Sequence, residues 1–428
     1  MKSKLKKILK KPFVRNVIIM ATGTAAAQGI SLLLLPLITR LYGPEAYGLM
    51  GVFMAVVMIV TPIAALTYPI AIVLPKQDEI AKALIRLSLY ITLGISGITL
   101  FILLLFKQPI VQLFQIEDIA PYLFLIPIVI LFAGLFQVMD QWLVRTKQFG
   151  TTAKVTFLHA LIVQGSKVGV GLFHPMASVL ITLSALGTGI RIILLALFTK
   201  GTDIKSFFDI NKNHEQVSLK AVAKTHRDFP LYRAPQTLID AISQNLPILM
   251  LTSFFGPASA GFYTIGRTVL SVPVQLIGNS VGDVFYPRIS EAGNNGENLT
   301  KLIKKATIAL ASVGIIPFGI VIIFGPWLFS FVFGEGWATA GEYARWIALW
   351  IFFMFINGPS IKAIPVLSLQ AYQLKYSIIT IIIRTTALAI GYFIFSSDLV
   401  AIALFGISGA VRTFTLTLII IHKSKKLY

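Results

Sequence analysis

The chain of 428 residues contains no cysteine, only five histidines and few acids. The absence of cysteine excludes disulfides, thiolate metal sites, thioether-linked haem and a cysteine nucleophile. The five histidines are scattered and do not form a zinc-binding pattern, so neither a metal site nor a cofactor is expected. Charged residues make up only 13% of the chain, against about 25% in a typical soluble domain. The composition therefore argues against an ordinary soluble protein.

The chain contains many long runs of apolar residues. Hydrophobic residues make up 56% of the chain, and a membrane-spanning helix needs about 20 mostly apolar residues. Twelve runs predict an all-α integral membrane protein with about twelve transmembrane helices; eleven is the alternative count, because a few runs are short or interrupted. The runs lie at 14–38, 45–72, 83–106, 119–143, 155–173, 176–198, 236–255, 258–285, 302–324, 343–358, 372–396 and 398–421.

The lysines and arginines predict the orientation of these helices. Of the 37 basic residues, 29 lie in alternate connections and at the two ends, whereas the opposite connections carry only Arg40 and Lys107. Positively charged connections stay on the cytoplasmic side. We therefore expect a multi-pass protein of the bacterial inner membrane with both termini cytoplasmic. Contact with membrane lipids explains the net charge of +20 without a nucleic-acid partner.

A polar and basic stretch at 199–235 divides the runs into two sets of six. The predicted organisation is an N-lobe at 14–198, a cytoplasmic linker at 199–235 and a C-lobe at 236–421. Residues 1–13 contain KSKLKKILKK, which is typical of a basic interfacial helix. Residues 422–428 are predicted to form a basic cytoplasmic tail.

The two halves also share a motif. Gly43-Pro44-x-x-x-Gly48 opens the second run, and Gly256-Pro257-x-x-x-Gly261 opens the eighth. Because six helices return the chain to its starting side, both copies have the same orientation. This pattern predicts a parallel repeat about a pseudo-two-fold axis along the membrane normal.

Ionisable residues inside the runs are the candidate functional residues, because charge in a bilayer is costly. Bases outnumber acids there, and the excess positive charge requires water or an anion. The bases are Lys167, Arg191, Arg267, Arg384 and Arg412. The acids are Asp140, Asp240 and Asp283, which are the candidates for ion coupling.

The eighth run carries polar residues at every fourth position. This spacing gives a stripe about 24 Å long, which suits the wall of a water-filled pathway; interhelical hydrogen bonding is the alternative. The stripe consists of Arg267, Ser271, Gln275, Asn279 and Asp283. Gln28 in the first run and Gln244 in the seventh add weaker support. Trp327, Trp337, Trp346 and Trp350 are predicted to form an interfacial aromatic belt.

The segment ATGTAAAQGISLLLLPLITRLYGPEAYGLMGVF carries a family pattern, which FFGPASAGFYTIGRTV repeats in the second half. It resembles the polysaccharide biosynthesis (O-antigen, Wzx-type) flippases of the multidrug/oligosaccharidyl-lipid/polysaccharide exporter superfamily. The resemblance implies two six-helix lobes in a V around a central cationic cavity, working by alternating access and driven by an ion gradient. It implies an undecaprenyl-diphosphate-linked oligosaccharide as cargo, moved from the cytoplasmic to the outer leaflet, with polysaccharide assembly enzymes as neighbours. The expected substrate-binding residues are Arg267, Arg384, Lys167, Arg191, Arg412, Gln275, Asn279, Gln28 and Gln244.

Other functions remain as alternatives. A multidrug/cation antiporter of the same superfamily would favour an acid-dominated cavity, and a lipid II flippase usually has two more helices. A membrane glycosyltransferase or polymerase would be expected to carry a large catalytic loop outside the membrane. No phosphate-binding loop, acidic metal pair or catalytic triad is found in the sequence, so we expect a transporter and not an enzyme.

Overall fold

The computed structural model describes residues 12–114, 116–199, 218–367 and 369–427, and every element in these ranges is a helix. The all-α prediction is confirmed. Residues 1–11 of the predicted interfacial helix and residues 200–217 of the predicted linker lie outside the described part, as do the side chains of Asn279 and Asp283. The chain forms two compact units, which consist of residues 1–42 with 49–249 and of residues 43–48 with 250–428.

Nine helices in the described part are long and apolar enough to cross a membrane. A multi-pass membrane protein is thus confirmed, whereas the count of twelve is not. The first predicted run and most of the second fall within one element, α2 (Pro12–Val60), which is counted as part of a single span, and two further predicted runs are absent from the nine. Of these, α5 (Phe149–Gly171) contains Lys154, His159 and Lys167, which lower its hydropathy, and α10 (Pro257–Pro273) has only 17 residues.

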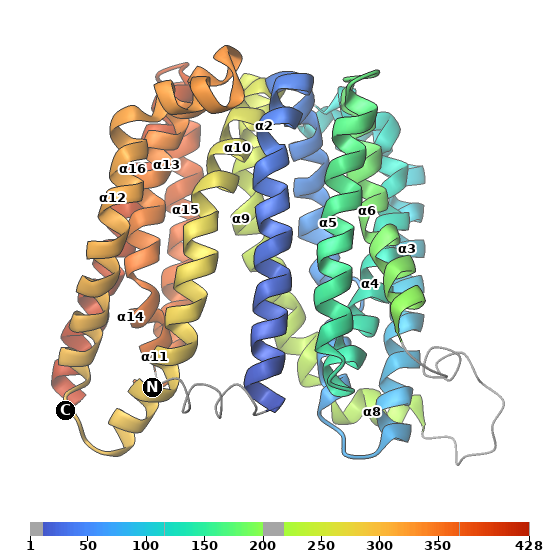
Figure 1. Ribbon diagram of the computed structural model, residues 1–428, viewed down its shortest axis with the longest axis vertical. Helices are drawn as coiled ribbons and strands as arrows, with labels where there is room; N and C mark the ends of the chain where they lie inside the picture. Colours follow the sequence, from blue (N-terminus) through green and yellow to red (C-terminus); the bar gives the residue numbers. More distant parts are fainter. Residues whose placement is uncertain (1–11, 115, 200–217, 368, 428) are drawn as a thin grey trace. The chain divides into compact units, whose positions relative to one another are not determined.

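A sharp kink divides α2, which is drawn in blue in Figure 1. At 1.5 Å per residue its 49 residues would span about 74 Å, more than twice the roughly 30 Å of a bilayer core. Gly43 breaks the helix with φ 71° and ψ 174°, and Gly256 adopts nearly the same conformation, φ 89° and ψ 171°, just before α10. Positive φ values of this kind favour glycine. The repeated Gly-Pro motif therefore produces the same backbone turn twice.

The last glycine of each motif allows two helices to touch. A Cβ atom on Gly48 would lie 1.8 Å from the carbonyl oxygen of Pro257, and one on Gly261 would lie 2.2 Å from that of Pro44. All four residues belong to the second unit. The two copies of the motif thus cross backbone to backbone, in the way that small residues permit in membrane helices.

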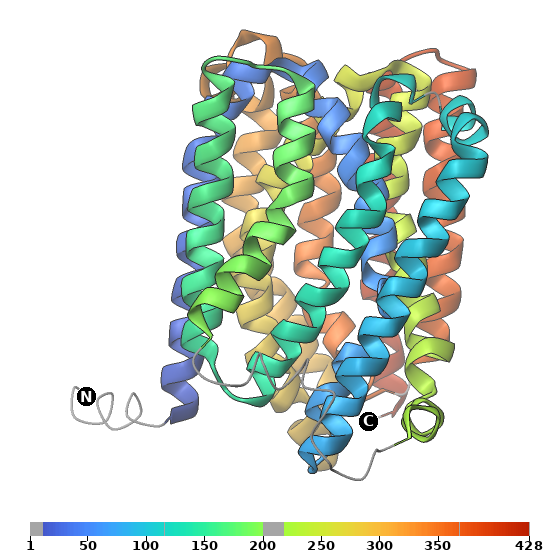
Figure 2. The ribbon, with the colours of Figure 1, turned by 90° about the vertical axis from the view of Figure 1, so that its right-hand side faces the viewer.

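The first unit is built from α3 (Asp78–Phe114), α4 (Leu125–Arg145), α5 and α6 (Ala177–Phe198) together with part of α2. In it α3 packs against α4, α5 against α6, and α4 against α6, and the long helices are seen side by side in Figure 2. Five short elements complete the described part of the unit: η1 (Thr61–Ile63), η2 (Tyr68–Val73), η3 (Glu117–Phe124), α8 (Leu219–Thr225) and η4 (Phe229–Arg233).

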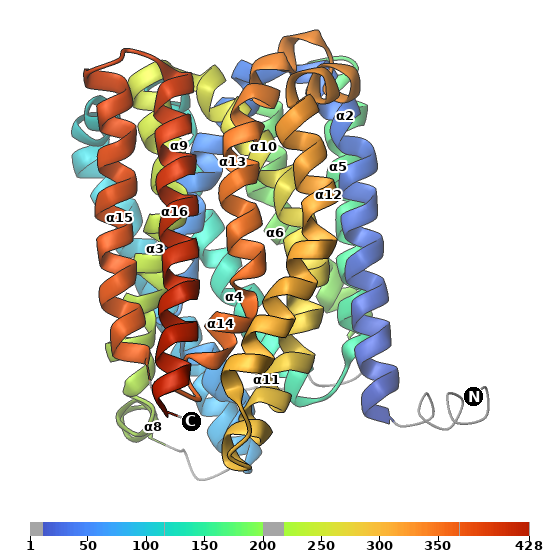
Figure 3. The same ribbon diagram turned by 90° about the vertical axis from the view of Figure 1, so that its left-hand side faces the viewer.

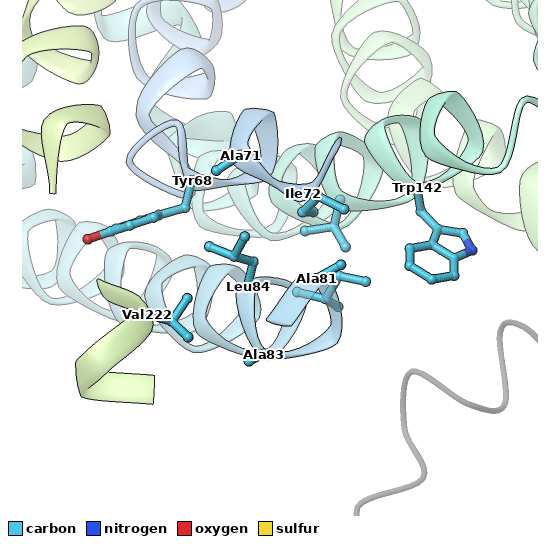
Figure 4. Packing of buried hydrophobic residues seen from close by; sticks show 10 residues of the cluster. Tyr68, Ala71, Ile72, Ala81, Ala83, Leu84, Trp142 and Val222 are labelled. Carbon is cyan, nitrogen blue, oxygen red and sulfur yellow. The ribbon is translucent and has the colours of Figure 1, made fainter. Parts of the chain in front are cut away.

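A compact apolar cluster closes one end of this unit (Figure 4). Tyr68 of η2, Leu84 of α3 and Val222 of α8 are all buried in it. The hydroxyl of Tyr68 donates to the carbonyl oxygen of Ala223, 3.2 Å away. The described end of the predicted linker is therefore anchored to the helical bundle.

Arg145, the last residue of α4, binds the end of η2 and the chain that follows it. Its guanidinium donates to the carbonyl oxygens of Ile72 (3.0 Å) and Pro75 (2.6 Å) and forms an ion pair with Asp78 (2.7 Å). Only 13% of the Arg145 side chain is exposed. One guanidinium thus satisfies two carbonyl groups that have left regular helical geometry.

We expect Arg145→Met to lower the free energy of unfolding of the first unit by about 2–3 kcal/mol, because it leaves these acceptors without a charged donor. Thermal unfolding in detergent would show a lower midpoint for this variant. Lys76→Met is the matched control, since Lys76 is exposed and its side chain forms no hydrogen bond with the described residues. Equal midpoints for the two variants would show that Arg145 does not stabilise this segment.

The second unit contains α10, α12, α13, α15 and α16. Figure 3 shows α12, α13, α15 and α16 side by side; α12 packs against α13, and α16 packs against both α13 and α15. The preceding helix α9 (Ala234–Phe255) continues from the first unit into the second. The remaining bounds are η5 (Val274–Gly278), α11 (Asn279–Asn294), α12 (Leu299–Phe333), η6 (Glu335–Trp337), α13 (Ala338–Ile356), α14 (Gly358–Ala363), α15 (Gln370–Phe393) and α16 (Asp398–Leu427).

Candidate functional site

Arg384 of α15 lies against two aromatic rings. The central carbon of its guanidinium lies 3.7 Å from the ring centre of Trp350 on α13 and 3.8 Å from that of Phe405 on α16. Gly409 allows this arrangement, because a Cβ there would lie 2.8 Å from the Trp350 ring. A cation over an aromatic face gains roughly 0.5–2 kcal/mol, the more so away from water. Side chains of α13 and α16 therefore hold this guanidinium in position.

The N–H groups of Arg384 lack acceptors. Its Nε and Nη2 atoms are buried and have no hydrogen-bond partner among the described residues. Buried donors are nearly always satisfied, and a charged one carries a larger penalty when it is not. Since the nearly perpendicular rings of Trp350 and Phe405 cover part of the guanidinium, an acceptor can approach Arg384 only on the sides that the rings leave open. This geometry suits the oxygens of a phosphate or carboxylate.

Two further arginines influence Arg384 electrostatically. The charges of Arg267 (α10) and Arg412 (α16) both act on Arg384. Arg412 donates to the hydroxyl of Thr380 and lies 5.1 Å from the ring centre of Tyr376, while its buried Nε has no partner. In the second unit the charges of arginines from three helices thus act together, and no described carboxylate acts on Arg384.

The bases of the first unit have a different environment. Arg191 of α6 donates to Thr156 (3.2 Å), stacks on Phe136 (4.1 Å) and interacts with the charge of Asp140 on α4. Lys167 of α5 approaches the sulfur of Met50 at 3.9 Å. In this unit an acid compensates for at least part of the basic charge.

The other predicted site residues are spread over several helices. Gln28 is partly buried in α2, Asp240 and Gln244 are exposed on α9, and Gln275 is exposed in η5. Gln28, Gln244 and Gln275 each take part in interactions within the protein. Ser271 donates to the carbonyl oxygen of Arg267, one turn earlier, as expected for a structural role. The polar stripe is therefore seen only in part, because the side chains of Asn279 and Asp283 are outside the description.

Sequence reasoning missed the aromatic residues of this site. Trp350 was assigned to an interfacial belt, whereas the structure places its ring over Arg384, because α13 and α15 both pack beside α16. Phe405 and Tyr376 were not singled out. A signal existed, since Tyr372, Tyr376, Thr380 and Arg384 recur at every fourth residue and so share one face of α15.

Comparison with known proteins places the chain in a family. A family model described as polysaccharide biosynthesis protein matches residues 37–342. The chain belongs to this family. The match covers both Gly-Pro motifs and Arg267, and it confirms the resemblance found in the sequence.

One curated relative and several solved structures are similar. The succinoglycan biosynthesis transport protein ExoT of Rhizobium meliloti (strain 1021) is 22% identical over 350 residues, which are 79% of this chain and 66% of ExoT. The chain thus spans slightly less than two thirds of that relative. An inward-facing multidrug resistance MATE family transporter of the MOP superfamily matches 97% of this chain and 99% of its own, with a TM-score of 0.69 and 14% identity.

Two more structures share the fold. The lipid II flippase MurJ, in an inward closed conformation, matches 96% of this chain and 90% of its own, with a TM-score of 0.69 and 14% identity. A MOP superfamily transporter from Pyrococcus furiosus, described as having a binding pocket of reversed polarity, matches 98% of this chain and 96% of its own, with a TM-score of 0.61 and 13% identity. These matches show that the chain has the fold that these membrane transporters and flippases share.

Proposed function

We propose that this protein is a flippase that moves an undecaprenyl-diphosphate-linked oligosaccharide from the cytoplasmic to the outer leaflet of the bacterial inner membrane. The observation that carries the proposal concerns Arg384. Its buried Nε and Nη2 groups have no acceptor among the described residues, and the charges of Arg267 and Arg412 act on it. A diphosphate supplies several oxygens that can accept from guanidinium groups in pairs. The family match and the transport role named for ExoT support the same class of cargo.

The arginines perform three tasks in this proposal. Arg384 binds the diphosphate through its Nε and Nη2 groups, and Arg412 supplies a second donor through its Nε, which has no partner among the described residues. Arg267 adds charge from α10 and raises the local concentration of anions. Because the oligosaccharide leaves with the same diphosphate, the protein forms and breaks no covalent bond. Transport then requires alternating exposure of this site to the two sides.

The multidrug/cation antiporter is the second candidate, because MATE transporters share the fold. An organic cation requires acidic or aromatic partners at its binding site. The aromatic rings around Arg384 are already occupied by a guanidinium, and no described acid acts on that guanidinium. The charge of the site therefore favours an anionic cargo.

Leaflet exchange of a fluorescent prenyl-diphosphate oligosaccharide in proteoliposomes tests the proposed function. We expect rapid exchange with the wild-type protein and inhibition by inorganic pyrophosphate. Organic cations are expected to leave the exchange unchanged. Absence of exchange under imposed proton or sodium gradients, together with uptake of organic cations, would establish the antiporter instead.

Asp140 is our first candidate for ion coupling, ahead of Asp240 and Asp283. It lies within a predicted span, interacts with the charge of Arg191, and forms no hydrogen bond or ion pair with the described residues. Its carboxylate is thus able to accept a proton from one side and release it to the other. Protonation would also leave the charge of Arg191 uncompensated and available to an anion.

We expect Asp140→Asn to retain exchange down a concentration gradient and to lose accumulation driven by a pH gradient, because an amide takes up no proton in this range. Accumulation in one leaflet would be measured at imposed gradients of about one pH unit. Glu117→Gln is the control, since Glu117 is exposed at the start of η3. Full accumulation by Asp140→Asn would transfer the coupling role to Asp240 or Asp283.

A further inference from the structure

A second group of aromatic residues and a cation lies at the other end of α15 and α16. The ammonium of Lys423 is 4.4 Å from the ring centre of Tyr372. That ring stacks on Tyr376, with centres 5.9 Å apart and an angle of 26° between the planes. The two tyrosines thus form a small aromatic platform with a cation at its edge.

This platform is aligned with the arginine site. Tyr372, Tyr376, Thr380 and Arg384 follow each other at intervals of four residues, so each step along α15 rises about 6 Å. Arg412 contacts both Thr380 and Tyr376, while Lys423 lies eleven residues further along α16, a rise of about 16 Å. Three cations, each on an aromatic ring, therefore follow one helix pair from the end of α16 toward its middle.

The platform is held in place by the core of the second unit. Tyr372 and Tyr376 pack against a buried cluster that includes Ile289, Ile303 and Ile420. The hydroxyl of Tyr376 donates to the carbonyl oxygen of Arg412, 2.7 Å away. The rings are therefore positioned by tertiary contacts and are not free surface side chains.

Lys423 differs from the other described lysine of this tail. It is partly buried and forms no hydrogen bond or ion pair with the described residues, whereas Lys425 is exposed. A single cation–aromatic contact holds an ammonium by only about 0.5–1 kcal/mol at an accessible site. Lys423 can therefore exchange this contact for a stronger one with a phosphate.

We propose that Lys423, Tyr372 and Tyr376 form a receiving subsite for the diphosphate and first sugar of the cargo. Lys423 takes the phosphate charge, and the tyrosine platform takes the apolar face of the sugar ring. The diphosphate then passes to Arg412 and to Arg384. This inference rests on the proposed function and adds a first binding step, at the membrane side on which the C-terminus lies.

The test separates binding from transport in the full-length protein in proteoliposomes. The probe is a prenyl diphosphate that carries one hexose. We expect Lys423→Gln and Tyr372→Leu each to raise the apparent KM about tenfold with kcat unchanged, because both act before the transport step. Tyr372→Phe should restore most of the affinity, since it keeps the aromatic face. Lys425→Gln is the matched control and should behave as the wild type.

A second measurement uses the absence of cysteine from the chain. A cysteine introduced as Lys423→Cys should react with a charged maleimide at least about fivefold more slowly when the probe is present in excess. One introduced as Lys425→Cys should react at the same rate with and without the probe.

The outcomes separate this inference from the proposed function. An unchanged KM in Lys423→Gln, or an unchanged KM with a lower kcat, would overturn the receiving subsite and leave the flippase intact. The receiving subsite would also be overturned if the probe did not slow labelling at position 423 while Arg384→Gln still reduced transport. Failure of the wild-type protein to move any prenyl diphosphate would remove both proposals together.

Discussion

Replacement of Arg384 by glutamine is expected to reduce leaflet exchange of a prenyl-diphosphate oligosaccharide by about 30- to 150-fold at low substrate concentration. Truncation of one partner of a desolvated charge pair costs about 2–3 kcal/mol or more, and each 1.4 kcal/mol is about tenfold in affinity. The effect should be large because the rings of Trp350 and Phe405 already hold Arg384 in position, so little ordering remains to be done on binding. Initial exchange rates in proteoliposomes, measured well below KM, give the comparison.

Two variants control for the loss of charge and of shape. Arg345→Gln should transport normally, because Arg345 is already paired with Glu342 (3.0 Å) and donates to the carbonyl oxygen of Ile323 (3.0 Å). Arg384→Lys keeps the charge but loses the planar fork, so we expect an intermediate rate. Equal losses in Arg384→Gln and Arg345→Gln would mean that general positive charge, and not this site, governs transport.

A combined loss of stability and of substrate binding is expected for Gly391→Ala. A Cβ at Gly391 on α15 would lie 2.2 Å from Cα and 2.6 Å from the backbone nitrogen of Ala401 on α16, and neither atom can move without the helix. Overpacking of this kind typically costs about 1–3 kcal/mol. Separation of α15 from α16 would also pull Arg384 away from Phe405. We therefore expect a lower unfolding midpoint together with weaker binding of the diphosphate.

Gly319→Ala in α12 is the matched control, because a Cβ there would meet no atom within 4 Å. Alanine has a higher helix propensity than glycine by about 1 kcal/mol, so this variant should be as stable as the wild type or more so. A Gly391→Ala protein with wild-type stability and binding would show that the contact between α15 and α16 does not hold the site together.

The helical membrane fold could be read from the sequence because it depends on local properties. Runs of apolar residues and the placement of basic residues are set by the bilayer itself. The Gly-Pro repeat could be recognised as easily, since positive φ at Gly43 and Gly256 is a local requirement. The number of spans was harder to predict, because α5 carries Lys167 and His159 and α10 is short.

The candidate site could be predicted only in part, because pairing depends on tertiary contacts. The sequence placed Arg191 and Arg384 in one set of bases. The structure gives Arg191 an acid, Asp140, while Arg384 receives Trp350 and Phe405. Trp350, Arg384 and Phe405 lie on three different helices and are separated by tens of residues in the chain, so no spacing rule connects them.

Binding of the head group to the purified protein tests the central claim most directly. Calorimetric titration of the full-length protein in detergent would compare a prenyl diphosphate with the matching prenyl alcohol, for the wild type and for Arg384→Gln. We predict that the wild type binds the diphosphate at least about 30-fold more tightly than the alcohol, and that this preference is largely lost in Arg384→Gln. Equal affinity of the wild type for the diphosphate and the alcohol would contradict the claim that the arginines of the second unit recognise the cargo through its charge.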